Sequence, residues 1–127
     1  MTRAAENLFA LLRATLHGRM TDAALFENCD EALWRGIYDL SSAQGVLAQA
    51  WDGLKFLPET MQPPKRLRLQ WAINVEQIEK VYRLQEKVIA KLASFYREHA
   101  IPMMILKGYG LSLFYPVPEH RPYGDID

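Results

Sequence analysis

The chain has 127 residues, of which 50% are hydrophobic and 24% are charged, as in an ordinary globular protein. Its 15 Lys and Arg residues balance 15 Asp and Glu residues, and this zero net charge argues against a broad basic surface for nucleic acid or membrane lipids. No stretch approaches the roughly 20 apolar residues that cross a bilayer, and the N-terminus lacks the apolar core of a signal peptide. Cys29 is the single cysteine, and we expect it to be a small, partly buried residue. We also expect a cytoplasmic protein with no membrane partner.

Three helices are predicted in the first half of the chain. Residues 3–17 place leucines at helical spacing, with Thr2 suited to cap the start and Gly18 suited to end it. A second helix is expected to begin at Asp30, and a third to run over about residues 42–54.

A long helix is predicted over about residues 65–99, where steps of three and four separate the apolar residues and neither Gly nor Pro interrupts. Trp71 and Tyr82 lie in this apolar stripe, and we interpret them as core residues rather than as a ligand-binding box. Glu79 and Arg83 are spaced to pair on the wet face of the same helix.

The pattern changes after residue 100. Ile101-Pro102 stops the helix, and the short apolar run of residues 103–106 is typical of a buried strand. A Lys-Gly turn, a short helix over residues 111–115 and a proline-marked loop follow, and residues 124–127 are expected to begin a second strand. His99 and His120 are expected at the surface rather than as ligands.

These elements predict an α+β fold. A mostly helical region, residues 1–100, would be followed by residues 101–127, the first two strands and the intervening short helix of a domain that is truncated after the last residue. An abrupt end within a strand leads us to expect a piece of a longer protein. Because a two-stranded sheet leaves an open edge, we also expect a tendency to form a homodimer.

Two carboxylates stand at the end of the chain, at Asp125 and Asp127. In a strand, side chains two positions apart point to the same face, so both carboxylates would project together. Their mutual repulsion is relieved by a hard divalent cation such as Mg²⁺, which prefers oxygen ligands. Nucleotidyl and phosphoryl transfer use such a site. The plainer alternative, a pair of solvated loop residues, is common for so short a motif.

Phosphate-binding features precede these carboxylates. Gly108 allows an anion to approach the backbone at the start of a short helix, and Lys107 adds a point charge. Arg121 is suited to hold phosphate oxygens with two nitrogens. Taken alone, Lys107 could equally pair with a nearby carboxylate or be solvated.

The order of these features resembles a known family. The segment ILKGYGLSLFYPVPEHRPYGDID is similar to nucleotidyltransferase-like proteins of the DNA polymerase beta superfamily, in particular an uncharacterised bacterial branch. The residues that carry the resemblance are Leu106, Lys107, Gly108, Leu111, Tyr115, Arg121, Gly124, Asp125, Ile126 and Asp127.

The resemblance implies transfer of a nucleoside monophosphate from a nucleoside triphosphate such as ATP, with Asp125 and Asp127 as Mg²⁺ ligands and Gly108 in the phosphate-binding turn. The acceptor, whether a protein side chain, an RNA end or a small molecule, is left open. Tyr109 stands where the superfamily usually has a serine, and the third carboxylate of the superfamily would lie beyond the chain, so the fragment itself is expected to be inactive. The alternative hypothesis is a non-catalytic helical interaction module with a degenerate nucleotide site.

Overall fold

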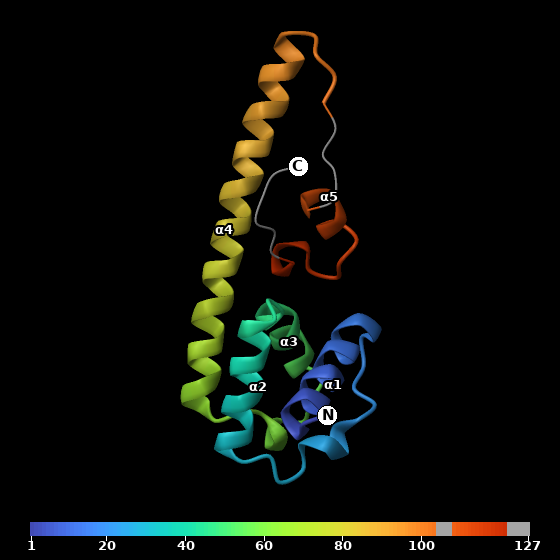
Figure 1. The fold of residues 1–127 in the computed structure, drawn as a ribbon, viewed down its shortest axis with the longest axis vertical. Helices are drawn as coiled ribbons and strands as arrows, with labels where there is room; N and C mark the ends of the chain where they lie inside the picture. Colours follow the sequence, from blue (N-terminus) through green and yellow to red (C-terminus); the bar gives the residue numbers. More distant parts are fainter. Residues whose placement is uncertain (104–107, 122–127) are drawn as a thin grey trace. The chain divides into compact units, whose positions relative to one another are not determined.

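The computed structural model describes residues 1–103 and 108–121, and in these ranges the regular structure is entirely helical (Figure 1). The expected α+β fold is therefore wrong, because the described residues form no strand. Of the two expected strands, residues 104–106 and 124–127 lie outside the described residues, and Met103 has no regular structure. A short apolar run does not by itself distinguish a strand from any other buried segment. The homodimer expectation depended on an open sheet edge and loses that physical basis.

The chain divides by its contacts into two compact units, Met1–Val75 and Glu76–Asp127. The first unit contains α1 (Arg3–His17), η1 (Ala23–Phe26), α2 (Glu31–Ala43), α3 (Leu47–Leu54) and η2 (Glu59–Met61). The helix expected over about residues 65–99 is α4 (Lys65–Glu98), whose first turns belong to the first unit and whose remainder belongs to the second. The second unit also contains α5 (Gly108–Ser112) and η3 (Pro118–His120).

The ends of the helices follow from capping chemistry. The Thr2 hydroxyl accepts a hydrogen bond from the Ala5 backbone N–H at 3.2 Å, and Gly18 ends α1 in the left-handed region, as the sequence predicted. The Asp30 carboxylate caps α2 by accepting from the Leu33 N–H at 2.8 Å. The prediction of a helix from residue 42 was wrong at its start, because α2 continues to Ala43 and a left-handed Gly45 separates it from α3.

Aromatic side chains fill the core of the first unit, where α2 and α3 lie beside the first turns of α4 and α1 packs against α2 and α3 (Figure 1). Trp71 is fully buried and its ring meets those of Tyr38, Trp34 and Trp51 at centroid distances of 5.4, 6.4 and 6.3 Å. The indole N–H of Trp71 donates to the Leu47 carbonyl at 2.9 Å, which satisfies its one polar group. The prediction that Trp71 is a core residue is confirmed.

The second unit has a smaller core on α4. Tyr82 and Ile89 are buried on one face of the helix, and Tyr109 of α5 packs against them. The two tyrosine rings lie 5.9 Å apart. The short helix expected over residues 111–115 instead runs over residues 108–112, so that Tyr109 and Ser112, three positions apart, both face α4. Among the described residues, none of the helices is both long enough and apolar enough to span a membrane.

Candidate functional site

The short helix α5 is held on α4 by two hydroxyl groups. Ser112 is fully buried, and its Oγ lies 2.8 Å from the Tyr82 hydroxyl and 2.5 Å from the Tyr109 carbonyl oxygen, to which it donates. One turn further along α4, the Tyr109 hydroxyl donates to the Glu86 carboxylate at 3.0 Å. Burial, followed by the hydrogen bond to Glu86, raises the pKa of Tyr109 above its ordinary value, so the phenol stays protonated as a donor.

The side chain of Tyr109 therefore serves to fix α5 on α4. In the family that the sequence resembles, a serine that donates to phosphate is expected at sequence position 109. A phenol that donates to Glu86 and packs at a tilt beside the Tyr82 ring does not supply that donation. Gly108, the preceding residue and another predicted phosphate-binding residue, begins α5.

A buried histidine connects the segment after α5 to the same helix. His120 ends η3, is only 6% exposed, and places Nε2 at 2.7 Å from Oε1 of Glu79. The other oxygen of Glu79 pairs with Arg83 at 3.3 Å, the spacing-four pair that the sequence predicted. The expectation of a surface His120 was wrong, because its burial depends on a contact across 41 positions of sequence that local patterning does not encode.

Arg121, one of the predicted phosphate-binding residues, follows His120 directly and is partly exposed. Its guanidinium carbon lies 5.9 Å from the centroid of the Tyr115 ring, and its backbone N–H donates to the Pro118 carbonyl at 3.1 Å. The first contact places the guanidinium beside the Tyr115 ring, and the second closes the turn of η3.

The remaining predicted site residues, Lys107, Asp125 and Asp127, lie outside the described residues. Within residues 1–103 and 108–121, no group of three or more His, Cys, Asp or Glu side chains could hold a metal ion. Of the predicted site, the structure thus places Gly108 and Arg121, at the beginning of α5 and the end of η3.

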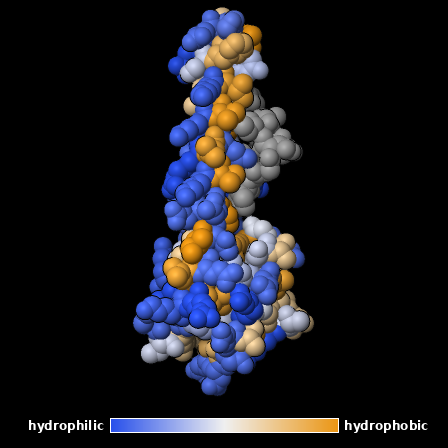
Figure 2. Space-filling model, turned by 90° about the vertical axis from the view of Figure 1, so that its left-hand side faces the viewer, coloured by the Kyte–Doolittle hydropathy of each residue, from blue (hydrophilic) through white to orange (hydrophobic). Residues whose placement is uncertain are grey.

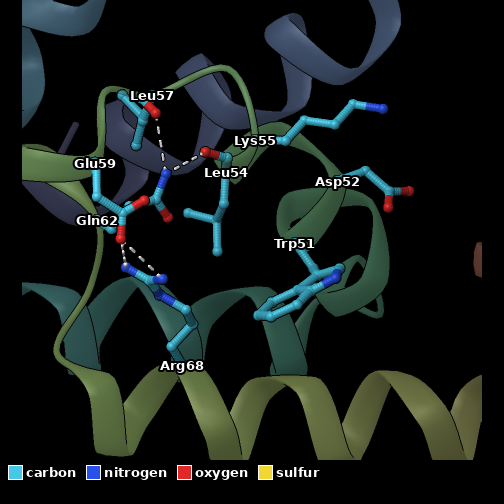
Figure 3. Close-up of a pocket in the computed structure, with 8 residues that line it drawn as sticks. All are labelled: Trp51, Asp52, Leu54, Lys55, Leu57, Glu59, Gln62 and Arg68. Atoms are coloured by element: carbon cyan, nitrogen blue, oxygen red, sulfur yellow. Dashed lines mark hydrogen bonds and ion pairs between the residues drawn. The ribbon is translucent and has the colours of Figure 1, made fainter.

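A separate cavity of about 320 Å³ lies in the first unit, between α3, η2 and the first turns of α4. Figure 3 shows the Arg68 guanidinium facing Glu59, with nitrogen and oxygen 3.4 Å apart, while Gln62 donates to the Leu54 and Leu57 carbonyls at 2.6 and 3.1 Å. These polar groups tie down the loop after α3. These residues form no short sequence motif, so the sequence did not predict this pocket.

A helical chain whose C-terminal sequence carries a Lys-Gly pair and a Gly-Asp-Ile-Asp motif fits a nucleotidyltransferase. The family of uncharacterised nucleotidyltransferases matches residues 30–127, and the chain belongs to this family. No curated protein and no solved structure matches the chain.

Proposed function

We propose that this protein is a Mg²⁺-dependent nucleotidyltransferase of the DNA polymerase beta superfamily, which transfers a nucleoside monophosphate from a nucleoside triphosphate to an acceptor. The observation that carries the proposal is the family match over residues 30–127, because that range includes every residue of the motif. The accepting group, a protein side chain, an RNA end or a small molecule, remains open to experiment.

Asp125 and Asp127 are the proposed ligands of the metal. Two carboxylates separated by one residue form an all-oxygen donor set that matches the preference of Mg²⁺, and their charge would offset that of the cation. When bound, Mg²⁺ stabilises the negative charge that develops on the phosphates during transfer. The role of the two side chains is to hold the ion.

Lys107, Gly108 and Arg121 are the proposed phosphate-binding residues. Gly108 begins α5, where backbone N–H groups without helical acceptors favour an anion. Arg121 lies beside the Tyr115 ring at the end of η3 and brings a planar donor set suited to phosphate oxygens. Support for grouping these residues comes from the attachment of both segments to α4 through Tyr109 and His120.

A direct test is titration of ATP in the presence of Mg²⁺ into the full-length protein and into an Asp125→Ala, Asp127→Ala double variant. We expect binding by the unaltered protein, and its loss or a weakening of more than about tenfold in the double variant, as for removal of metal ligands. Asp39→Ala, a change at an exposed carboxylate of α2, is the matched control and should bind as the unaltered protein does. Equal affinity of all three proteins would contradict the assignment.

The alternative function is a non-catalytic interaction module, and one surface feature favours it. Val81, Leu84, Val88 and Phe95 form an apolar row on the outer face of α4 and are 47–61% exposed. Figure 2 shows this row as a hydrophobic band along the helix, with hydrophilic side chains beside it. Exposed apolar bands of this kind often contact other proteins. Absence of any ATP binding by the unaltered protein would favour this function.

A further inference from the structure

The apolar row on the outer face of α4 has the spacing of a helix-packing surface. Val81, Leu84, Val88 and Phe95 follow one another at steps of three, four and seven, so their side chains leave the helix along one line. They are 53, 61, 47 and 52% exposed and form part of the hydrophobic band in Figure 2. At 1.5 Å per residue the row is about 21 Å long, which matches a partner helix of about four turns.

Lysines border this apolar row. Lys80 and Lys87 each directly precede a valine of the row, and Lys91 fills the gap before Phe95, so all three exposed ammonium groups lie on or beside the same line. Lys80 pairs with Glu76 at 3.6 Å, an exposed contact that contributes little. Among the described residues, neither Lys87 nor Lys91 forms an ion pair. The row is therefore apolar along its centre and positively charged along its edge.

The nearby carboxylates of α4 lie on the other side of the helix. Glu79 and Glu86 each stand two positions before a valine of the row, and two positions turn about 200° around a helix. Glu79 contacts His120, and Glu86 accepts a hydrogen bond from Tyr109. Neither carboxylate is directed toward the row, so the positive charge of its edge is not offset from within this stretch of α4.

The charges of the edge decide between two kinds of occupant. A second copy of the chain would bring like charges together, because a parallel pair of helices sets Lys91 opposite its copy and an antiparallel pair sets the two lysine-bearing edges side by side. We propose that the apolar row binds an amphipathic helix of another protein, whose apolar side chains cover the row and whose Asp or Glu residues face the lysines. This inference does not depend on the proposed function.

The test uses the full-length protein and two synthetic helical peptides that differ only in charge. Each peptide has leucines along the apolar face of about three heptads, and the flanking positions are all Glu in one peptide and all Lys in the other. Fluorescence anisotropy of the labelled peptides measures both affinities. The Glu peptide should bind at least about tenfold more tightly than the Lys peptide, and the difference should shrink in about 1 M salt.

A substitution within the row tests whether the Glu peptide binds there. Leu84→Gln should weaken binding of the Glu peptide about tenfold or more, because Leu84 is a large apolar residue near the centre of the row. Leu16→Gln is the matched control, since Leu16 lies on α1 and is 63% exposed, against 61% for Leu84. Glutamine has nearly the helix propensity of leucine, so circular dichroism should show equal helical content in both variants.

A charge reversal tests the lysine edge and does not depend on the apolar substitution. In a Lys87→Glu, Lys91→Glu double variant the preference should invert, so that the Lys peptide binds more tightly than the Glu peptide. A gain of binding to the Lys peptide cannot arise from a loss of folding.

The outcomes separate the possible occupants. The proposal is overturned if the full-length protein binds neither peptide, binds both equally, or binds the Glu peptide as well after Leu84→Gln as after Leu16→Gln. It is also overturned if sedimentation velocity finds a dimer that Leu84→Gln dissociates, because the row then belongs to a second copy. Binding of ATP with Mg²⁺ should be the same in the unaltered protein and in Leu84→Gln, so a failure of the proposed function is distinguishable from a failure of this one.

Discussion

Ala100 ends α4 in the left-handed region, with φ of 56°, a conformation that disfavours any residue with a Cβ atom. The Ile101 N–H closes the helix by donating to the Tyr96 carbonyl at 2.8 Å. Ala100→Gly should raise the free energy of unfolding by about 0.5 kcal/mol, since a left-handed strain of roughly 1–2 kcal/mol exceeds the extra chain entropy that glycine loses. Denaturant titration followed by circular dichroism measures the change.

Gly18 allows the reverse substitution, from glycine to alanine at a left-handed helix end. It ends α1 with φ of 72° and no atom would crowd an added Cβ, so Gly18→Ala changes only the backbone preference. That variant should lose about 1 kcal/mol of stability. If both variants change stability in the same direction, the left-handed strain at residue 100 does not govern the end of α4.

Cys29 gives a prediction about reactivity. Burial raises the pKa of its thiol from 9.0 to about 11, and a raised pKa in the folded state means that the thiolate is scarce at neutral pH. The stability linked to this thiol is complete below pH 9 and is lost as the pH rises through about 11. At pH 8, alkylation of the folded chain should be about a hundredfold slower than alkylation in denaturant. Equal rates measured by mass spectrometry would show that the thiol is not protected.

At the scale of elements, α1 and α3 approach so closely at Gly53 that an added Cβ would overlap the backbone of Leu11. Because backbone yields less readily than a side chain, Gly53→Ala should cost about 2–3 kcal/mol and separate the two helices. Gly36, within α2, has room for a Cβ, whose nearest neighbour would be Ala4 at 3.7 Å. Gly36→Ala should instead add about 0.5–1 kcal/mol through helix propensity. Thermal unfolding of the two variants compares them, and a stable Gly53→Ala protein would contradict the close approach.

The helices of the first unit and α4 were largely predictable from sequence because their determinants are local. Thr2 and Gly18 mark the ends of α1, and the spacing of Leu67, Trp71 and Tyr82 marks the buried side of α4. The boundary between α2 and α3 was missed because Gly45 can either continue a helical pattern or leave it in the left-handed region.

The expected strands were predicted from short apolar runs, whose structure depends on partners that the runs themselves do not specify. The same limit applies to the candidate site. The motif indicated Gly108 and Arg121, but the contacts that attach Tyr109 to Glu86 and His120 to Glu79 join residues 23 and 41 positions apart. Glu79 therefore looked like an ordinary member of a surface ion pair with Arg83.

At the scale of the molecule, the two units keep separate cores although α4 contributes to both. The three tryptophans all belong to the first unit, where Trp34 and Trp51 each contact Trp71. The second unit depends on Tyr82, Ile89 and Tyr109. Tryptophan fluorescence therefore reports on the first unit, whereas far-ultraviolet circular dichroism reports on the helices of both.

Tyr82→Ala should consequently uncouple the two signals. The substitution removes a buried ring and the hydrogen bond to Ser112, and losses of this kind cost about 3–5 kcal/mol. A helix can fray from its C-terminal end while its first turns stay packed, so part of the helical signal should be lost at lower denaturant than the fluorescence change. Tyr82→Phe keeps the ring and should shift the first transition much less. Coincident transitions for Tyr82→Ala would mean that the two cores unfold as one cooperative body.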